Sequence, residues 1–410
     1  MTFSFTLTAD QERFMQSARA FAQTHLRDLA TATAAESRPL ERALLARPAF
    51  ESAVAEGYLR AMIPPAAGGS AGSGIEAAIL IEQWAAECPD FFISMAGPLI
   101  ALMPVYAAGT PEQVQRFVAP FLAASGAPVA AMAFSEPEGS ANFDVPAPNG
   151  IQTTAVPDGD DYVINGRKAW AAFLSGWDGD GPDIMSIVCR APGGVSIIVA
   201  EREHLAGRIE VEEHYDLPGL RGCLTSRVCL NNVRVPKSNL VGAEGQGVAL
   251  TRGAFLASGA SIGVFATAAM SKAFDIALDF ARTDARGGAE PVITHQAVAD
   301  VLANAKGRLE AVRLLSWRAM DAILSGHPSG PEWALHSKIF GSDTAVQVVN
   351  ELIQVVGVQA YDLNHPLMPI LSDVLSYPII EGGNIGIRRR QLQALMSTPE
   401  YDAHAASGVA

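Results

Sequence analysis

One carboxylate of this chain stands in a sequence context that suits a catalytic base. Glu381 follows Ile379 and Ile380, precedes Gly382 and Gly383, and has no cation among the six residues after it. Burying a carboxylate among apolar residues costs desolvation energy, which raises its pKa and lets it take and return a proton near neutral pH. The glycines allow a backbone or a bound molecule to approach closely. The alternative is an ordinary loop residue, and the rest of the chain decides between the two.

Length and composition predict a large protein of several domains. A chain of 410 residues is too long for a single core. Hydrophobic residues make up 49% and charged residues 18%, below the roughly 25% charge of soluble domains, so we expect a homodimer or homotetramer. The net charge of −14 disfavours nucleic acid and anionic membrane surfaces as partners. The lengths of the apolar runs suggest no membrane-spanning helix and the N-terminus resembles no signal peptide, so a cytoplasmic location is expected.

The cysteines and histidines suggest no metal site. Cys88, Cys189, Cys223 and Cys229 include no Cys-x-x-Cys pair, and none has a histidine at the spacing of metal ligands. We expect free thiols.

Three segments of different pattern follow one another. Residues 1–127 predict a helical domain, with a capping box at Thr8 and Gln11 and helices over 40–57, 74–87 and 111–123. Residues 128–242 predict an antiparallel β-barrel or sandwich, including a strand over 161–168 that meets a hairpin turn at Asn165-Gly166.

The last segment is helical again. Residues 243–397 predict a four-helix bundle divided by prolines, and the small residues between Ala254 and Ala277 permit close helix packing. A disordered tail is expected over 398–410.

Four separated motifs resemble the acyl-CoA dehydrogenase family of flavoproteins, in the order that this family has them. They are Ala131-Met-Ala-Phe-Ser-Glu-Pro137, Tyr162-Val-Ile-Asn-Gly-Arg-Lys-Ala-Trp170, Val233-Arg-Val-Pro-Lys-Ser-Asn-Leu240, and a C-terminal set formed by Gln354, Gly357, Pro366, Asp373 and Glu381. The intervals within that last set are three, nine, seven and eight residues, which match the family register without a gap.

The resemblance implies a role for each matching residue. Glu381 matches the base that removes the α-proton of an acyl thioester while a hydride passes from the β-carbon to flavin N5 of FAD. Residues matched to FAD contacts are Phe134, Ser135, Ser140, Trp170, Arg286, Gln354, Gly357 and Gly383. Arg282 is an alternative to Arg286. Gln354 and Gly357 match residues that hold the ADP half of a neighbouring subunit's FAD. Substrate contacts are expected at Phe255, Trp177 and Gly382, with Trp177 lining or covering the acyl pocket.

Departures from the family pattern bear on the substrate. Ala171 stands where a hydroxyl normally reaches flavin N5, and Leu256 and Gly259 replace contacts to the pantetheine arm. We therefore expect retained base chemistry with a changed substrate handle, either a carrier-protein thioester or a CoA ester of an unusual acyl group.

Three functions remain open. The first is a dehydrogenase for an acyl thioester carried by CoA or an acyl carrier protein, with an electron-transfer flavoprotein as acceptor. The second is a flavin oxidase or monooxygenase on the same fold, which uses O2. The third is an FAD-less partner subunit of a hetero-oligomer. Glu381 favours the first.

Overall fold

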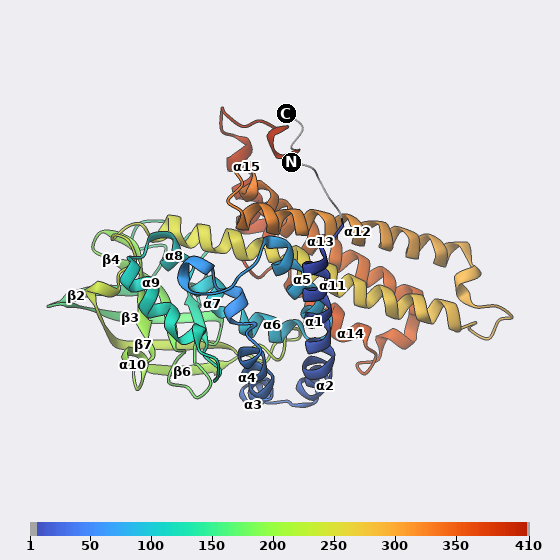
Figure 1. Ribbon diagram of the computed structural model, residues 1–410, viewed down its shortest axis with the longest axis horizontal. Helices are drawn as coiled ribbons and strands as arrows, with labels where there is room; N and C mark the ends of the chain where they lie inside the picture. The colour runs from blue at the N-terminus through green and yellow to red at the C-terminus, as the bar shows by residue number, and fades with distance from the viewer. Residues whose placement is uncertain (1–5, 408–410) are drawn as a thin grey trace.

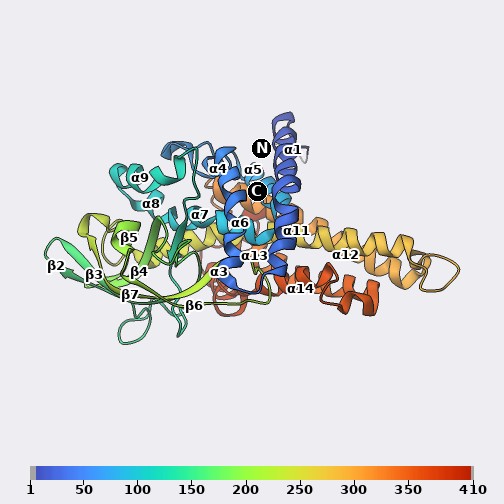
Figure 2. The same ribbon diagram turned by 90° about the horizontal axis from the view of Figure 1, so that it is seen from below.

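The computed structural model describes residues 6–407 and has three structural parts. Residues 1–5, which belong to the N-terminus that resembles no signal peptide, and 408–410, the end of the expected tail, lie outside the described residues. The earlier helices of the first part lie across the middle of the molecule, and its last helices lie beside the strands at one end. The long C-terminal helices extend to the other end (Figures 1 and 2).

The N-terminal part consists of short helices around an aromatic core. Thr8 Oγ accepts from the Gln11 backbone at 3.2 Å and Thr8 N donates to Gln11 Oε1 at 3.0 Å, which confirms the predicted capping box. The core includes Trp84 stacked on Phe21, with ring centroids 4.7 Å apart. The helices are α1 (Ala9–Phe21), α2 (Arg27–Ala35), α3 (Pro39–Leu44), α4 (Arg47–Ala55), α5 (Gly74–Ala85), α6 (Pro89–Met95), α7 (Gly97–Ala101), α8 (Met103–Ala108) and α9 (Pro111–Val118).

The middle part is one curled, seven-stranded sheet. Most pairings are antiparallel, whereas β1 and β2 each pair with β4 in parallel. The path of the sheet is β1-β4-β2-β3-β7-β6, and β5 pairs with β4. The strands are β1 (Ala130–Ala133), β2 (Thr154–Asp158), β3 (Asp161–Ala172), β4 (Ile184–Ala191), β5 (Gly194–Glu201), β6 (Ile209–His214) and β7 (Thr225–Pro236), with a helical turn α10 (Arg202–Leu205) after β5.

The predicted hairpin turn at Asn165-Gly166 is wrong. Strand β3 runs through both residues, with an irregularity against β7 between Ile164 and Gly166. The turn lies instead at Gly159-Asp160, where Asp158 pairs with Asp161. Gly166 is needed for packing, because a Cβ there would lie 2.5 Å from Thr153 Oγ1.

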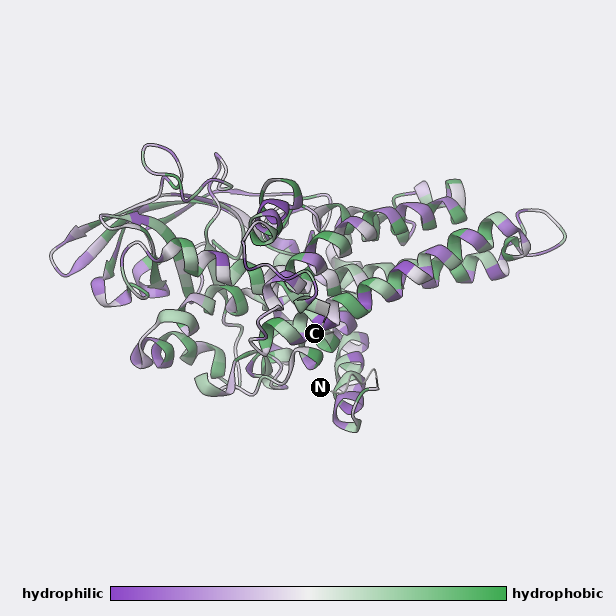
Figure 3. Cartoon of the chain, turned by 90° about the horizontal axis from the view of Figure 1, so that it is seen from above, coloured by the Kyte–Doolittle hydropathy of each residue, from purple (hydrophilic) through white to green (hydrophobic). Residues whose placement is uncertain are grey.

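The C-terminal part is a bundle of α11 (Gly247–Thr283), α12 (Gln296–Leu324), α13 (Gly330–Val356) and α14 (Leu367–Ser376). The predicted divisions at prolines and the close packing are confirmed. A Cβ at Gly341 of α13 would lie 2.9 Å from Gly263 Cα of α11. Hydrophobic and hydrophilic residues alternate along these helices (Figure 3), as expected of amphipathic bundle helices. A π-helical turn η8 (Asn384–Arg388) and α15 (Arg389–Met396) follow.

Helix α11 and the tail correct two expectations. By length and composition α11 could cross a membrane, contrary to the expectation from the apolar runs, but 67% of its most apolar window is buried inside the structure. The expected disorder of the tail is wrong for residues 401–406. Tyr401 OH donates to Glu332 at 2.7 Å, and Trp333 Nε1 donates to the Ala406 carbonyl at 3.0 Å.

Candidate active site

A cavity of about 1580 Å³ lies where the three parts meet, and Glu381 is on its wall. The volume exceeds the roughly 300–1000 Å³ of an ordinary ligand pocket. It therefore provides room for a substrate and for a large cofactor in one continuous space.

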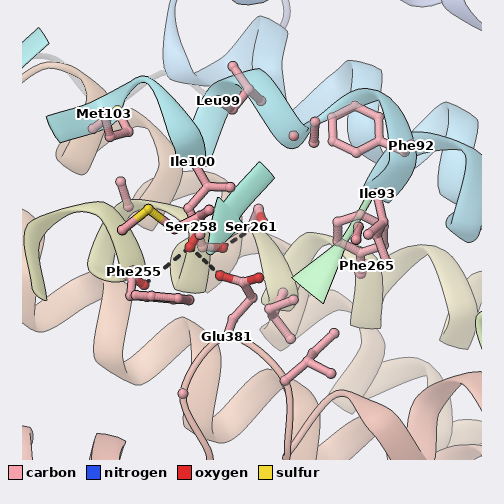
Figure 4. A pocket seen from close by; sticks show the side chains of 18 of the residues that line it. Phe92, Ile93, Leu99, Ile100, Met103, Phe255, Ser258, Ser261, Phe265 and Glu381 are labelled. Atoms are coloured by element: carbon pink, nitrogen blue, oxygen red, sulfur yellow. Dashed lines mark hydrogen bonds between the residues drawn. The ribbon is translucent and has the colours of Figure 1, made fainter. Parts of the chain in front are cut away.

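Glu381 is held in a strained loop with its carboxylate directed into this cavity (Figure 4). Its φ of 52° lies in the left-handed region that non-glycine residues rarely adopt, and such strain tends to occur at functional sites. Ser258 Oγ of α11 donates a hydrogen bond to Oε2. The residue is partly accessible because it faces the cavity. Burial raises the pKa of the Glu381 carboxyl, and the Ser258 hydrogen bond with the charges of Arg388 and Lys338 only partly offsets that rise.

Arg388 secures the backbone of the same loop. The residue is 1% exposed, and its guanidinium donates from Nε to the Glu381 carbonyl at 2.9 Å and from Nη2 to the Phe255 carbonyl. A Cβ at Gly259 would lie 2.8 Å from Arg388 Nη2, and one at Gly382 would lie 2.9 Å from Nε. The guanidinium thus occupies the space beside Gly259, where the family pattern leads one to expect a substrate contact.

The wall opposite Glu381 is apolar. In Figure 4 Phe255 and Phe265 of α11 flank the carboxylate, and the labelled apolar side chains across the cavity come from α6, α7 and α8. These are Phe92, Ile93, Leu99, Ile100 and Met103. Such a surface accepts a hydrocarbon chain and offers little to a polar one.

Residues matched to the flavin line the same cavity. Phe134, Ser135, Ser140 and Trp170 all contribute to its wall, as do Gly382, Gly383 and Phe255. Trp170 has φ 64°, is 55% exposed, and stacks on Tyr215 with centroids 4.0 Å apart. An indole face presented at the edge of so large a cavity suits a flat ring system, so these residues fit FAD.

A buried ion pair lies behind Phe134 and was not foreseen from the sequence. Lys168 Nζ donates to Glu136 at 3.0 Å and to the carbonyls of Phe134 at 3.1 Å and Val188 at 2.7 Å. Both partners stand inside quoted motifs, Ser-Glu-Pro and Gly-Arg-Lys, but nothing in the sequence showed that they meet.

Arg286 and Gly357 lie together at a different place. A Cβ at Gly357 would lie 3.1 Å from Arg286 Nη2, and neither residue, nor Gln354, lines the cavity around Glu381. The residues matched to the two halves of FAD therefore form two separate groups within one chain.

The prediction that Trp177 lines the pocket is wrong. Its ring is 7% exposed, packs edge-on against Phe50 and Phe173, and donates from Nε1 to the Ala127 carbonyl at 2.8 Å. The glycine-rich loop turns the indole into the core between the helical part and the sheet, where it finds both apolar neighbours and a hydrogen-bond acceptor.

Family models match most of the chain. The acyl-CoA dehydrogenase N-terminal domain matches residues 8–125, and the acyl-CoA dehydrogenase C-terminal domain matches residues 245–396. The chain belongs to the acyl-CoA dehydrogenase family. Members of this family, nitroalkane oxidases included, are FAD flavoproteins, and this protein is a flavoprotein oxidoreductase with FAD as its cofactor.

Similar proteins within the family have two kinds of activity. Nitroalkane oxidase from Podospora anserina is 38% identical over 98% of both chains, and its solved structure matches with a TM-score of 0.95 over 99% of this chain and 100% of the other. Nitroalkane oxidase from Fusarium oxysporum is 32% identical over 98% of this chain and 97% of its own length. Cyclohexane-1-carbonyl-CoA dehydrogenase from Geobacter metallireducens is 29% identical over 85% of this chain and 88% of its own length.

Proposed function

We propose that this protein is an FAD-dependent oxidase of nitroalkanes with an apolar chain, and that Glu381 removes the proton from the carbon that bears the nitro group. The observation that carries this proposal is that the Glu381 carboxylate, whose pKa is raised, faces an apolar wall in a cavity shared with the flavin contacts. The similarity to two nitroalkane oxidases over nearly full length supports this choice. This is the second of the three functions that the sequence left open, so it replaces the first as our preferred reading.

The chemistry suits a single carboxylate base that faces the substrate cavity. A nitro group takes up the negative charge left when its α-proton is removed, so a nitroalkane is a far stronger carbon acid than a thioester. A carboxylate with a raised pKa is a correspondingly stronger base at neutral pH. Ser258 keeps the carboxylate oriented through its hydrogen bond to Oε2.

Arg388 supports the same assignment. A solved nitroalkane oxidase is described by the roles of an aspartate and of an arginine seven residues after it in the reaction. Here Glu381 is followed by Arg388 at the same spacing. We infer that Glu381 replaces that aspartate and that Arg388, which binds the Glu381 carbonyl, holds it in place.

The apolar wall sets the substrate class. A nitroalkane oxidase mutant has been crystallised with 1-nitrooctane, and the wall formed by α6, α7 and α8 suits a chain of that kind here. No contact for a pantetheine arm is needed, which accounts for the space beside Gly259 being given to Arg388.

The overall reaction balances with O2 as the acceptor. FAD, when bound, accepts the electron pair and passes it to O2. One primary nitroalkane, one O2 and one water then give one aldehyde, one nitrous acid and one H2O2. The residues of the chain supply the base, the apolar seat and the exclusion of bulk water.

Acyl-thioester dehydrogenation is the second candidate. The glutamate at position 381 fits it, as does the similarity to a cyclohexane-1-carbonyl-CoA dehydrogenase. An electron-transfer flavoprotein would then be the acceptor. The FAD-less partner role is disfavoured because the cavity wall keeps residues that match flavin contacts of the family.

We also propose that the protein is a homodimer or homotetramer in the cytoplasm. Arg286 and Gly357 lie together but away from the Glu381 cavity, which fits contacts to the FAD of a neighbouring subunit. Exposed apolar side chains just after Gly357, namely Val358 at 84% and Tyr361 at 79%, suit burial against such a neighbour.

A substrate panel separates the two candidates. The FAD-loaded protein is mixed anaerobically with 1-nitrohexane, 1-nitrooctane, octanoyl-CoA and cyclohexane-1-carbonyl-CoA, and flavin absorbance is followed before air is admitted. We expect bleaching by the nitroalkanes alone, then rapid reoxidation with release of nitrite and H2O2. Bleaching by a thioester but not by a nitroalkane would establish the second candidate instead.

A further inference from the structure

We infer that Lys338 is a positioning residue for Glu381, because its ammonium group ties together both ends of the loop that carries the base. The inference rests on the proposed function only in taking Glu381 as the base. Lys338 lies on α13 and is not one of the residues that line the cavity.

The contacts of Lys338 reach the start and the end of one short loop. Its Nζ donates to the carbonyl of Tyr377, where the loop leaves α14, and to Oδ1 of Asn384, where η8 begins, at 3.2 Å. The side chain is 0% exposed. Glu381 lies between the two contact points, so Lys338 bridges the two ends of the loop that carries the base.

Asn384 is fixed from the other side as well. Its Nδ2 donates to Ser342 Oγ and to Asp343 Oδ1, each at 2.9 Å, and its backbone N–H donates to the Pro378 carbonyl at 2.9 Å. Ser342 Oγ in turn donates to the Lys338 carbonyl at 2.6 Å. The loop is thus closed on itself and anchored to one face of α13.

Such anchoring has an identifiable purpose at this position. Glu381 holds φ 52° and Gly382 holds φ 79°, and a non-glycine residue keeps a left-handed conformation only when its surroundings over-determine it. A buried ammonium group without a carboxylate at contact distance is costly. That cost is understandable if the group serves to fix the loop.

The charge of Lys338 also acts on the base. The charged groups near it are Glu381 in the loop, Arg388 in η8 and Asp343 on α13. Burial lowers the pKa of Lys338 to about 7, and its positive charge lowers the pKa of Glu381. Removing that charge must therefore move the pKa of Glu381 upward.

The test uses Lys338→Met in the FAD-loaded full chain, because methionine has a similar length and neither charge nor donor. We expect kcat/KM at pH 7 to fall by up to about 10²-fold, the loss that a misplacement near 1 Å can cause. The acid limb of the kcat/KM profile will move to higher pH. Hydrogen exchange of peptides covering residues 376–388 will speed up, while peptides from the sheet keep their wild-type rates.

Two further variants sharpen the test. Asn384→Leu removes the same hydrogen bond from the side of its acceptor. The fall in kcat/KM of the double variant will therefore be smaller than the product of the falls in the two single variants. Lys272→Met is the control, because Lys272 is a surface lysine 40% exposed in an ion pair with Glu87. It will leave the rate, the pH profile and the exchange unchanged.

The outcomes separate this inference from the proposed function. A uniform loss of stability with an unmoved acid limb and no local change in exchange would overturn the role of Lys338. A wild-type protein that fails to turn over nitroalkanes overturns the proposed function alone. In that case the exchange experiment, which needs no substrate, and the pH profile with the active thioester still decide the role of Lys338.

Discussion

Two glutamates of this protein lie near buried lysines, and yet their pKa values are shifted in opposite directions. Glu136 accepts four hydrogen bonds, from Lys168 at 3.0 Å, Thr153 N at 2.9 Å, Thr153 Oγ1 at 2.6 Å and Gln152 N at 2.7 Å. Burial acts to raise its pKa, but the Lys168 charge and these hydrogen bonds outweigh it and lower the pKa of Glu136. The carboxylate of Glu381 accepts a hydrogen bond from Ser258, and its pKa is raised.

The difference lies in how the nearby lysine is used. Lys168 binds the Glu136 carboxylate itself, whereas Lys338 binds the backbone and the amide around Glu381. A carboxylate with its lone pairs satisfied stays ionised and serves the structure. One whose loop is fixed while its oxygens remain available is suited to exchange protons. Substitutions at these two glutamates and at the residues that hold them therefore test this contrast.

The largest effect is expected from Glu381→Gln. It removes the base while keeping shape and volume, so substrate-driven flavin bleaching will fall by at least ~10³-fold, with FAD still bound. Anaerobic stopped-flow absorbance measures the loss.

Glu381→Gln is also expected to affect the stability of the fold. Because the raised pKa of Glu381 means that its ionised form disfavours folding, the variant will be at least as stable as the wild type above neutral pH. A variant that reduces flavin at the wild-type rate would place the base elsewhere.

Lys168→Met, on the structural side of the contrast, is expected to destabilise the protein. It leaves Glu136 charged and buried without its cation, which costs about 3–5 kcal/mol of unfolding free energy. Urea titration followed by fluorescence measures this. Since the folded-state pKa of Glu136 is lowered, its stabilising contribution is present above the ordinary carboxyl pKa and is lost as the pH falls. The penalty of the variant will therefore be largest at neutral pH and shrink in acid. A constant penalty from pH 3 to pH 7 contradicts the ion-pair account.

Ser258→Ala is a smaller change on the reactive side. The Ser258 hydrogen bond lowers the pKa of Glu381, so its removal will raise that pKa and move the acid limb of kcat/KM to higher pH. A hydrogen bond to a charged group is worth about 1.5–3 kcal/mol, so about a tenfold loss is expected on the acid side and a smaller loss above neutral pH. Ser261, a cavity residue three positions further along α11, serves as the matched alanine control.

The contacts that distinguish Glu136 from Glu381 could not be predicted from the sequence, because they join residues far apart in the chain. The capping box at Thr8, the helix divisions at prolines and the apolar context of Glu381 are local, so spacing and residue type suffice to predict them. Ser258 and Glu381 are 123 residues apart and Lys168 and Glu136 are 32 apart. Only the packing of α11 and the pairing of the sheet bring them together.

Two predictions failed because tertiary contacts outweighed a local signal. Asn165-Gly166 has the composition of a hairpin turn, but Gly166 is required where the strand passes Thr153. Trp177 stands in a glycine-rich loop that suggests solvent or a pocket, but a hydrogen-bond acceptor and two aromatic rings were available in the core. Neither environment can be inferred from neighbours in sequence.

The smallest effect is expected from Gly259→Ala, with Gly253→Ala as its control on the same helix. Alanine in a helix interior is favoured over glycine by up to about 1 kcal/mol, and a Cβ at Gly253 meets nothing within 4 Å. Gly253→Ala will therefore stabilise the protein and leave kcat/KM unchanged. A Cβ at Gly259 would lie 2.8 Å from Arg388 Nη2, so the guanidinium must shift away from the Phe255 and Glu381 carbonyls. That shift will cancel the gain in stability and lower kcat/KM by about threefold to tenfold, as a modest misplacement of the base does. If both variants gain stability equally and keep full activity, the position of Arg388 does not control Glu381, and the orientation of the base then depends on Ser258 and the α13 contacts alone.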